Sequence, residues 1–401
     1  MRGGQPDAGP LRALVFETLV RLDAAGAPQP CLAVSWQHDA AAKRWQFNLR
    51  PGVKFHDGSP LTAAVAATIL AAALPGATVA AAGDSTVAIR ANRPLADLPL
   101  DLAHNGWLET GPFRPTAFDP GHRATFTANA DYWGGRPFLD AIDVQLGRGL
   151  RDQLADLELG KADVVEVDPI DLRRVQGGTG FSRSVWSSAA VRLIALAFQP
   201  DHPSDPRLRE ALALSIDRAP MHSVLLQKQG EPTAALLPQW LSGYAFAFPA
   251  ALDLPRARAL SNALPPAGRT LTLTYDPAMR AARSLAERVA VNAHDAGLAV
   301  QVSPQNPHAD VRLLEVYLTS LDPAQALAGF AAALGLPTPS TGASLAALYE
   351  SERKLLEGFH AIPLFQLPIL YAASRVHVDA PPITRLGDWR FADVWLSGTA
   401  P

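Results

Sequence analysis

One strand–helix–strand unit limits the folds open to this chain more than any other feature. Residues 271–275 alternate apolar and polar side chains, as a half-buried strand does. Asp276 and Pro277 then start a helix, Gly297 ends it, and residues 298–302 form a second strand. Strands joined in this way lie parallel, with a right-handed crossover between them. The unit therefore predicts an α/β fold.

Shorter patterns predict other local structure. Residues 45–49 alternate as a strand, and a turn is expected to return the chain through 53–55 as a hairpin. Helices are expected to begin with Ser59 and with Asp205 as N-caps, each followed by a proline. A further strand is expected at 311–316.

Length and composition predict more than one lobe. The chain has 401 residues, whereas single cores stop growing beyond about 250–300 residues. Hydrophobic residues make up 48% and charged residues 18%, as in globular proteins. The formal net charge of −3 excludes a strongly basic surface for nucleic acid. An apolar strand at 191–198 runs into the polar, proline-rich segment 199–203, which marks a lobe boundary.

Features that fix a cellular compartment are few. Cys31 is the single cysteine, so no internal disulfide can form. Residues 1–6 have no apolar segment of a signal peptide, so export would need a leader that this sequence does not show. No charge-free apolar run reaches about 18 residues, so no transmembrane helix is expected.

Motifs of catalytic or metal sites are also missing. The ten histidines lack HExxH or HxxxH spacing. The glycine-rich segment 177–180 lacks the Lys-Ser/Thr of a phosphate-binding loop and is interpreted as a turn. Glu350 and Glu352 are expected on the solvated face of a surface helix. We therefore expect no enzyme, no metal site and no cofactor.

Several segments resemble a known family when they are taken in order along the chain. The segments are 15–20, 30–36, 45–58, 110–113, 131–135, 157–163, 208–218 and 362–365. Their order and spacing resemble the family 5 extracellular solute-binding proteins of ABC importers, which include oligopeptide, dipeptide and nickel binders. The stretch 47–58 is long and specific, and the matches extend over nearly the whole chain.

The resemblance implies a two-lobed α/β fold of the periplasmic-binding-protein type, class II, with hinge strands between the lobes. Lobe I would comprise 1–198 plus 376–401, with a subdomain at about 21–110, and lobe II would comprise 199–375. The hinges would lie near 195–199 and 371–378. A monomer that captures a small-molecule or peptide-like ligand is implied. It would deliver that ligand to ABC permease subunits from a periplasmic or extracytoplasmic position.

The resemblance also implies which residues contact the ligand. They are Phe16, Glu17, Thr18, Trp107, Gln199, Tyr317, Thr319 and Ser320. Two interpretations of Glu17 stay open. The carboxylate either meets a polar or cationic group of the ligand, or is a structural group capped by backbone amides.

Two departures from the family bear on the ligand. Peptide binders carry an acidic residue that anchors the peptide's amino terminus, but Thr319 and Ser320 occupy the matching stretch 317–323. Burying an ammonium group without a carboxylate partner is costly. The expected ligand is therefore a small polar solute, or a modified peptide without a free amino terminus. The segment 322–355, which helps to close the cleft in the family, is also shorter than usual.

Two other functions were weighed. A ligand-sensing regulatory module, related to solute-binding proteins but without a transport role, would fit the missing leader. The sequence shows no helix-turn-helix or basic patch to support it. A hydrolase on an α/β scaffold would need a nucleophile and a base, and no motif places them.

Overall fold

The computed structural model describes thirteen stretches of the chain and divides the chain into two compact units. The described residues are 11–23, 27–39, 41–74, 76–92, 94–95, 98–103, 108–177, 183–201, 204–279, 281–340, 344–374, 376–377 and 382–396. Unit 1 comprises 1–148, 160–164 and 373–401, and unit 2 comprises 149–159 and 165–372. Unit 1 thus contains both ends of the chain.

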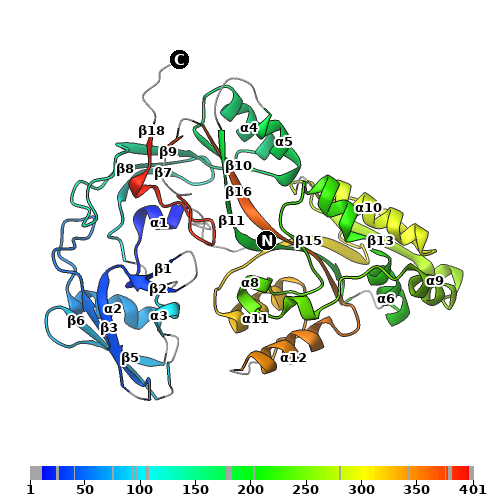
Figure 1. Cartoon of the computed structure of the whole chain (residues 1–401), viewed down its shortest axis with the longest axis horizontal. Helices are drawn as coiled ribbons and strands as arrows, with labels where there is room; N and C mark the ends of the chain where they lie inside the picture. The colour runs from blue at the N-terminus through cyan, green and yellow to red at the C-terminus, as the bar shows by residue number, and fades with distance from the viewer. Residues whose placement is uncertain are drawn as a thin grey trace. The chain divides into compact units, whose positions relative to one another are not determined.

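Unit 1 is built on two antiparallel sheets (Figure 1). The four-stranded sheet has the order β3 (Ala33–His38), β4 (Arg44–Leu49), β6 (Thr86–Ala91) and β5 (Ala77–Ala81). The three-stranded sheet has the order β7 (Phe113–Asp119), β8 (Arg123–Ala128) and β9 (Ala141–Gln145). Two short pairs join β1 (Val20–Leu22) to β2 (Pro28–Pro30) and β17 (Val376–His377) to β18 (Trp395–Leu396). The helices are α1 (Arg12–Val15), α2 (Ala63–Ala73) and α3 (Leu98–Asp101).

The main core of unit 1 forms between the four-stranded sheet and α2. Trp45, Phe47 and Leu49 are buried on alternate positions of β4, as the period-two pattern predicts. Leu70 and the small alanines of α2 pack in the same cluster. Alanines allow this face of the helix to lie close to the sheet, and the opposite face, with Ala64, Val65 and Thr68, is exposed.

Unit 2 is organised around a mixed sheet of order β10-β16-β11-β15-β13-β14, with β12 paired to β16. In that order the strands are Val164–Val167, Ala361–Ser374, Arg183–Phe198, Val311–Tyr317, Thr270–Tyr275 and Ala299–Val302, and β12 is Glu231–Pro232. Strand β13 pairs in parallel with both β14 and β15. The predicted strand–helix–strand order and the strand predicted at 311–316 are confirmed. The helix start predicted at Asp276 and Pro277 is wrong, because Asp276 accepts the amide of Ala278 in a turn and α10 (Ala282–Asp295) begins five residues after Pro277.

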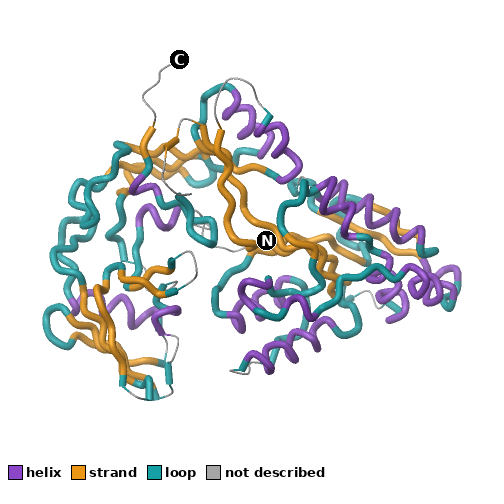
Figure 2. The backbone as a smooth tube through the Cα atoms, viewed as in Figure 1, coloured by secondary structure: helices purple, strands orange, loops and turns teal. Residues whose placement is uncertain are grey.

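Two groups of helices accompany this sheet (Figure 2). One contains α6 (Pro206–Ser215), α9 (Leu254–Asn262) and α10 (Ala282–Asp295), and the other contains α8 (Gln239–Ser242), α11 (Pro323–Ala333) and α12 (Leu345–Leu356). Short helices α4 (Leu150–Glu158), α5 (Leu172–Gln176) and α7 (Arg218–Pro220) complete the unit. Helices α6 and α10 bury Leu212, Leu285 and Val289 in one core with Ile194 and Leu196 of β11.

Two local predictions near residue 55 are wrong. Strand β4 pairs with β3 and β6, whereas Lys54 makes only an isolated bridge to Pro60. Val53 is instead buried in the core of unit 1. The N-cap of α2 is Thr62, whose hydroxyl accepts the amide of Val65. Ser59 lies three residues before this cap, and its hydroxyl donates to Asp57 at 2.6 Å. The N-cap predicted at Asp205 is confirmed.

The division into units differs from the predicted lobe boundary. Residues 149–159 and 165–198 were expected in lobe I but belong to unit 2, and 373–375 were expected in lobe II but belong to unit 1. The physical reason is strand pairing, since β11 lies between β16 and β15 in a single sheet. The chain passes between the units at 148/149, 159/160, 164/165 and 372/373, and the last of these crossings lies inside the hinge expected at 371–378. The hinge expected at 195–199 lies within unit 2.

Candidate functional site

A buried carboxylate lies where the motif segments of unit 1 meet. The side chain of Glu17 belongs to a residue that is only 8% exposed. Its Oε2 accepts the hydroxyl of Thr110 and the indole N–H of Trp133, both at 2.8 Å. Its Oε1 accepts the hydroxyl of Tyr132 at 2.9 Å and the thiol of Cys31 at 3.8 Å. Side chains, rather than the backbone amides expected for a structural carboxylate, therefore occupy both oxygens.

Burial controls the protonation of this cluster. It raises the pKa of Glu17 above its usual value, although the hydrogen bonds from Trp133, Thr110 and Tyr132 offset part of the effect. Burial also raises the pKa of Cys31 to about 12, and the neighbouring carboxylate adds to that shift. A thiol held in its neutral form is a poor nucleophile and a poor metal ligand. The cluster therefore has the properties of a structural joint.

Backbone and cation–π contacts extend the joint. Glu17 and Leu108 exchange backbone hydrogen bonds of 2.8 and 2.7 Å. The guanidinium of Arg50 lies 4.1 Å from the ring centroid of Trp133 and donates to the carbonyl of Cys31 at 3.0 Å. Four segments that carry the family resemblance, 15–20, 45–58, 110–113 and 131–135, are thus tied together around one carboxylate.

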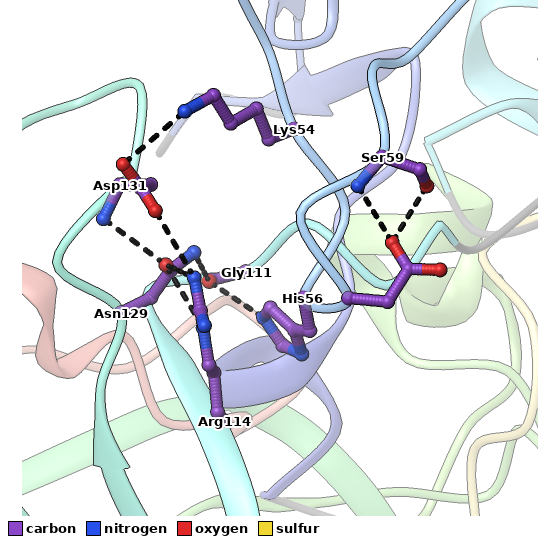
Figure 3. A network of polar contacts seen from close by, with 8 residues as sticks. Lys54, His56, Ser59, Gly111, Arg114, Asn129 and Asp131 are labelled. Atoms are coloured by element: carbon purple, nitrogen blue, oxygen red, sulfur yellow. Dashed lines mark hydrogen bonds and ion pairs between the residues drawn. The ribbon is translucent and has the colours of Figure 1, made fainter.

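A polar network next to this joint holds the carbonyl of Gly111 (Figure 3). That oxygen lies 2.9 Å from Nε2 of His56 and accepts a hydrogen bond from the side-chain amide nitrogen of Asn129 at 3.1 Å. Arg114 donates to the side-chain oxygen of Asn129 at 2.6 Å, and its guanidinium lies 3.5 Å from Asp131. The network links the 53–58 turn to the three-stranded sheet.

The ligand-contact residues predicted for unit 1 differ in exposure. Phe16 is half-buried and ends α1. Thr18 is 4% exposed, and its hydroxyl donates to the carbonyl of Val20 at 2.6 Å. Trp107 lies outside the described residues. Of the described residues predicted in this unit, only Phe16 has side-chain surface that is not already buried.

The residues predicted for unit 2 fall into two places. Register pairs Arg192 with Tyr317 at one end of the paired stretch of β11 and β15, and Phe198 with Val311 at the other end. Tyr317 is 47% exposed at the first end, whereas Gln199 follows Phe198 at the second. Six residues of strand separate them by roughly 20 Å. One small solute cannot contact both side chains.

Thr319 and Ser320 lie between β15 and α11, close to Tyr317. Thr319 is exposed, and the hydroxyl of Ser320 accepts the amide of Asp322 at 3.0 Å. Asp322 is in turn the N-cap of α11, accepting the amide of Gln325 at 2.7 Å. The acidic residue nearest in sequence is therefore engaged in capping a helix.

A charged cluster lies on the same end of the sheet. The guanidinium of Arg192 donates to Glu315 at 2.9 Å and to the carbonyl of Pro368 at 3.1 and 2.7 Å. Burial raises the pKa of Glu315 and of Glu166, and the nearby guanidinium opposes both shifts. The carboxylate of Glu315 is thus held by Arg192 rather than presented freely.

Sequence analysis placed Glu352 on a solvated face, and this prediction is wrong. The residue is fully buried, at 0% exposure. Its Oε1 accepts the amides of Leu236 and Leu237 at 2.6 and 3.1 Å, and its Oε2 accepts the hydroxyl of Tyr244 at 2.7 Å. Glu352 therefore fixes the segment 236–244 against α12. The helical period indicated this burial, because Leu348 lies four residues before Glu352 and Leu355 three residues after it. Both leucines are on the same helix face and are also buried.

Glu352→Gln is expected to lower the free energy of unfolding by about 2 kcal/mol, because the new NH₂ group faces buried donors in place of an acceptor. Urea denaturation measures the change. Glu350, two residues away and about half exposed, pairs with Arg353 on the surface. Glu350→Gln is the matched control and should leave the denaturation midpoint unchanged. Equal effects of the two substitutions would contradict the structural role of Glu352.

The described residues hold few other candidate sites. Among the described residues, no group of three His, Cys, Asp or Glu side chains is placed to hold a metal ion. Within the same residues, no helix is both long and apolar enough to cross a bilayer. Gly177 follows α5, and residues 178–180 of the glycine-rich segment lie outside the described residues.

Comparison with known sequences agrees with the arrangement of these motifs. The profile described as "Bacterial extracellular solute-binding proteins, family 5 Middle" matches residues 27–95 and 101–325. The chain is 22% identical over 249 residues to the probable D,D-dipeptide-binding periplasmic protein of Escherichia coli, covering 53% of this chain and 48% of that protein. It covers 30% of the oligopeptide-binding protein AppA of Bacillus subtilis, with 24% identity. The chain thus spans about half or less of the length of these relatives.

Solved structures share the fold at low identity. NikA from Brucella suis, solved in complex with Fe(III)-EDTA, superimposes with a TM-score of 0.80 at 19% identity, over 99% of this chain and 96% of that one. A dipeptide-binding protein from a Pseudoalteromonas species, in complex with Met-Leu, gives 0.76 at 16% identity, over 96% and 94% of the two chains. These likenesses show the two-lobed class II fold.

Proposed function

Because the chain belongs to the family 5 bacterial extracellular solute-binding proteins, we propose that it is the ligand-capturing component of an ABC importer. The observation that carries the proposal is the family match, which runs through both units. The family consists of non-catalytic binding proteins, and the buried carboxylate of Glu17 belongs to a structural joint. Permease subunits would receive the ligand, and the protein would act in the periplasm or outside the cytoplasmic membrane.

We infer that the ligand is a small polar solute or a peptide-like molecule without a free amino terminus. The relatives' own names and structures include peptides and metal chelates. Thr319 and Ser320 supply hydroxyls, which can hydrogen-bond a neutral amide but cannot neutralise an ammonium. The nearby carboxylates of Asp322 and Glu315 are held by α11 and by Arg192. Tyr317, Thr319 and Ser320 are the proposed ligand contacts of unit 2.

Ligand capture in a two-lobed binding protein requires the lobes to close over the solute. We propose that 371–378 contains a hinge, because the chain passes between the units at 372/373. Closure would bury the ligand and would reduce the radius of gyration measured by small-angle scattering.

Calorimetry tests the ligand class. Unblocked di- to pentapeptides and their N-acetylated forms are titrated into the protein, after mass spectrometry has identified any ligand that it carries from purification. We expect the unblocked peptides not to reach a Kd of about 1 μM. Micromolar or tighter binding that is lost on acetylation would contradict the inferred ligand class. Failure to bind any solute released from the native protein would contradict the binding function itself.

A further inference from the structure

A glycine lies in the interior of the alanine-rich helix α11 of unit 2 (Figure 1). In a helix interior, glycine lowers the folding constant about fivefold relative to alanine. The backbone of Gly329 is helical and its φ is not positive, so the local conformation does not require a glycine. A glycine at this position therefore needs a reason in the packing around it.

The hydroxyl of Thr319 occupies the space beside Gly329. A Cβ added to Gly329 would lie 2.9 Å from Oγ1 of Thr319, a distance at which one of the two atoms must move. No other atom outside the adjacent helix backbone lies within 4 Å of that Cβ. Among the described residues, the steric reason for a glycine at 329 is thus the hydroxyl of a proposed ligand contact.

Packing, rather than hydrogen bonding, sets the position of this hydroxyl. Thr319 is exposed, and no hydrogen bond joins its hydroxyl to another of the described residues. The amide of Leu318 bonds the carbonyl of Val191 at 2.7 Å, which holds the backbone before Thr319 to the sheet. Threonine is branched at Cβ, so few χ1 rotamers are open to it. A methyl group at 329 would therefore turn the Thr319 hydroxyl away from α11 by rotation about χ1.

We propose that Gly329 is a positioning residue, which leaves room for the hydroxyl of Thr319 to lie against α11. The hydroxyl then keeps both its donor and its acceptor for a neutral polar group of the ligand, such as an amide. The stability that α11 loses at this position is the consequence of that arrangement. The ligand role of Thr319 rests on the proposed function, whereas the positioning of Thr319 by Gly329 does not.

A double-mutant cycle in urea denaturation of the full chain tests the positioning. In the Thr319→Ala background, Gly329→Ala is expected to lower the unfolding constant about fivefold through helix propensity. With Thr319 present, the same substitution should change that constant by no more than about twofold, because the threonine must leave its rotamer. Ala328→Gly, at the half-buried neighbouring position, calibrates the propensity and should raise the constant about fivefold.

Equal effects of Gly329→Ala in the two backgrounds would overturn the proposal. If Gly329→Ala does not fold on its own, the double variant decides. Its folding would support Thr319 as the obstacle, whereas its failure would show that the new methyl group meets something else.

Methyl NMR of threonine gives a readout that helix propensity alone does not move. Three-bond couplings of the γ-methyl carbon of Thr319 report its χ1 rotamer, and Thr319→Ala identifies the signal. Gly329→Ala is expected to change these couplings to those of another rotamer, and Ala328→Gly should leave them unchanged. An unchanged rotamer in Gly329→Ala would overturn the proposal.

Uptake of solute separates the positioning from the proposed function. The probe is the mixture of solutes extracted from denatured wild-type protein, added back to stripped and refolded proteins and counted by mass spectrometry. Gly329→Ala and Thr319→Ala should each weaken uptake about fivefold, the effect of one hydrogen bond, while Ala328→Gly follows wild type. Wild-type uptake by a Gly329→Ala protein whose rotamer has changed would overturn the ligand role of the hydroxyl. No uptake by wild type itself would contradict the proposed function, and the cycle and the rotamer would still decide the positioning.

Discussion

Glu17→Ala is expected to lower the free energy of unfolding of unit 1 by about 3–4 kcal/mol. The substitution removes the one acceptor shared by Thr110, Tyr132 and Trp133, and Thr110 is only 1% exposed. Their donors would then stay buried without partners, and a cavity would remain at the joint. Urea denaturation followed by tryptophan fluorescence measures the loss, since Trp133 itself contacts the carboxylate.

Glu17→Gln separates the shape of this side chain from its charge. The amide keeps one acceptor but turns its NH₂ group toward donors, so a smaller loss of about 1–2 kcal/mol is expected. Because burial raises the pKa of Glu17, the folded protein binds this proton more tightly than the unfolded chain does. Wild-type stability therefore declines as the pH rises from about 4.5, the usual value, and the glutamine variant lacks this decline. A deficit of the glutamine variant that grows with pH would contradict this account.

Local periodicity was sufficient for part of the fold. The alternation at 271–275 and Gly297 at the helix end indicate the parallel pair β13–β14 without reference to any other part of the chain, although α10 begins only at Ala282. The cap at Asp205 was predictable for the same reason, because its partner is the amide two residues later. Such features depend on residues that are close in sequence.

The joint around Glu17 could not be derived in this way. Three of its four side-chain hydrogen-bond partners lie 93, 115 and 116 residues further along the chain. Family resemblance identified the segments, but no pattern in a single segment shows that they converge on one carboxylate. The usual exposure of glutamate also argued against a buried side chain at position 352, because glutamate is seldom buried without partners. Its partners are backbone amides and a tyrosine hydroxyl on a segment more than 100 residues earlier.

The candidate ligand residues show a third limit of prediction from sequence, which is strand register. Gln199 and Tyr317 both end strands, which made one site plausible from sequence. The antiparallel register of β11 and β15 places them at opposite ends of the strand pair. Register depends on which side chains meet across two strands, and a single sequence does not specify that pairing between strands so far apart.

Gly230→Ala is expected to cost unit 2 about 3–5 kcal/mol. Gly230 has a φ of +70°, and a Cβ there would lie 2.7 Å from Cδ2 and 3.0 Å from Cα of Leu367. The neighbouring carbonyl of Gln366 is closer still, and backbone in the buried strand β16 cannot move aside cheaply. Relief would require β12 to part from β16, with which Glu231 and Pro232 pair. Thermal or urea denaturation of unit 2 measures the loss.

Gly243→Ala is the matched control because it isolates the steric part of this cost. Gly243 has almost the same φ, +73°, and lies in the same unit, but nothing lies within 4 Å of a Cβ at that position. Gly243→Ala therefore costs only the strain of a residue with a side chain in the left-handed conformation, about 1–2 kcal/mol. The difference in the free energy of unfolding between the two variants therefore measures the steric cost of the close approach of β16 to position 230. If Gly230→Ala were no more destabilising than Gly243→Ala, β12 would have to be free to shift without loss, and its pairing with β16 would contribute little to the stability of unit 2.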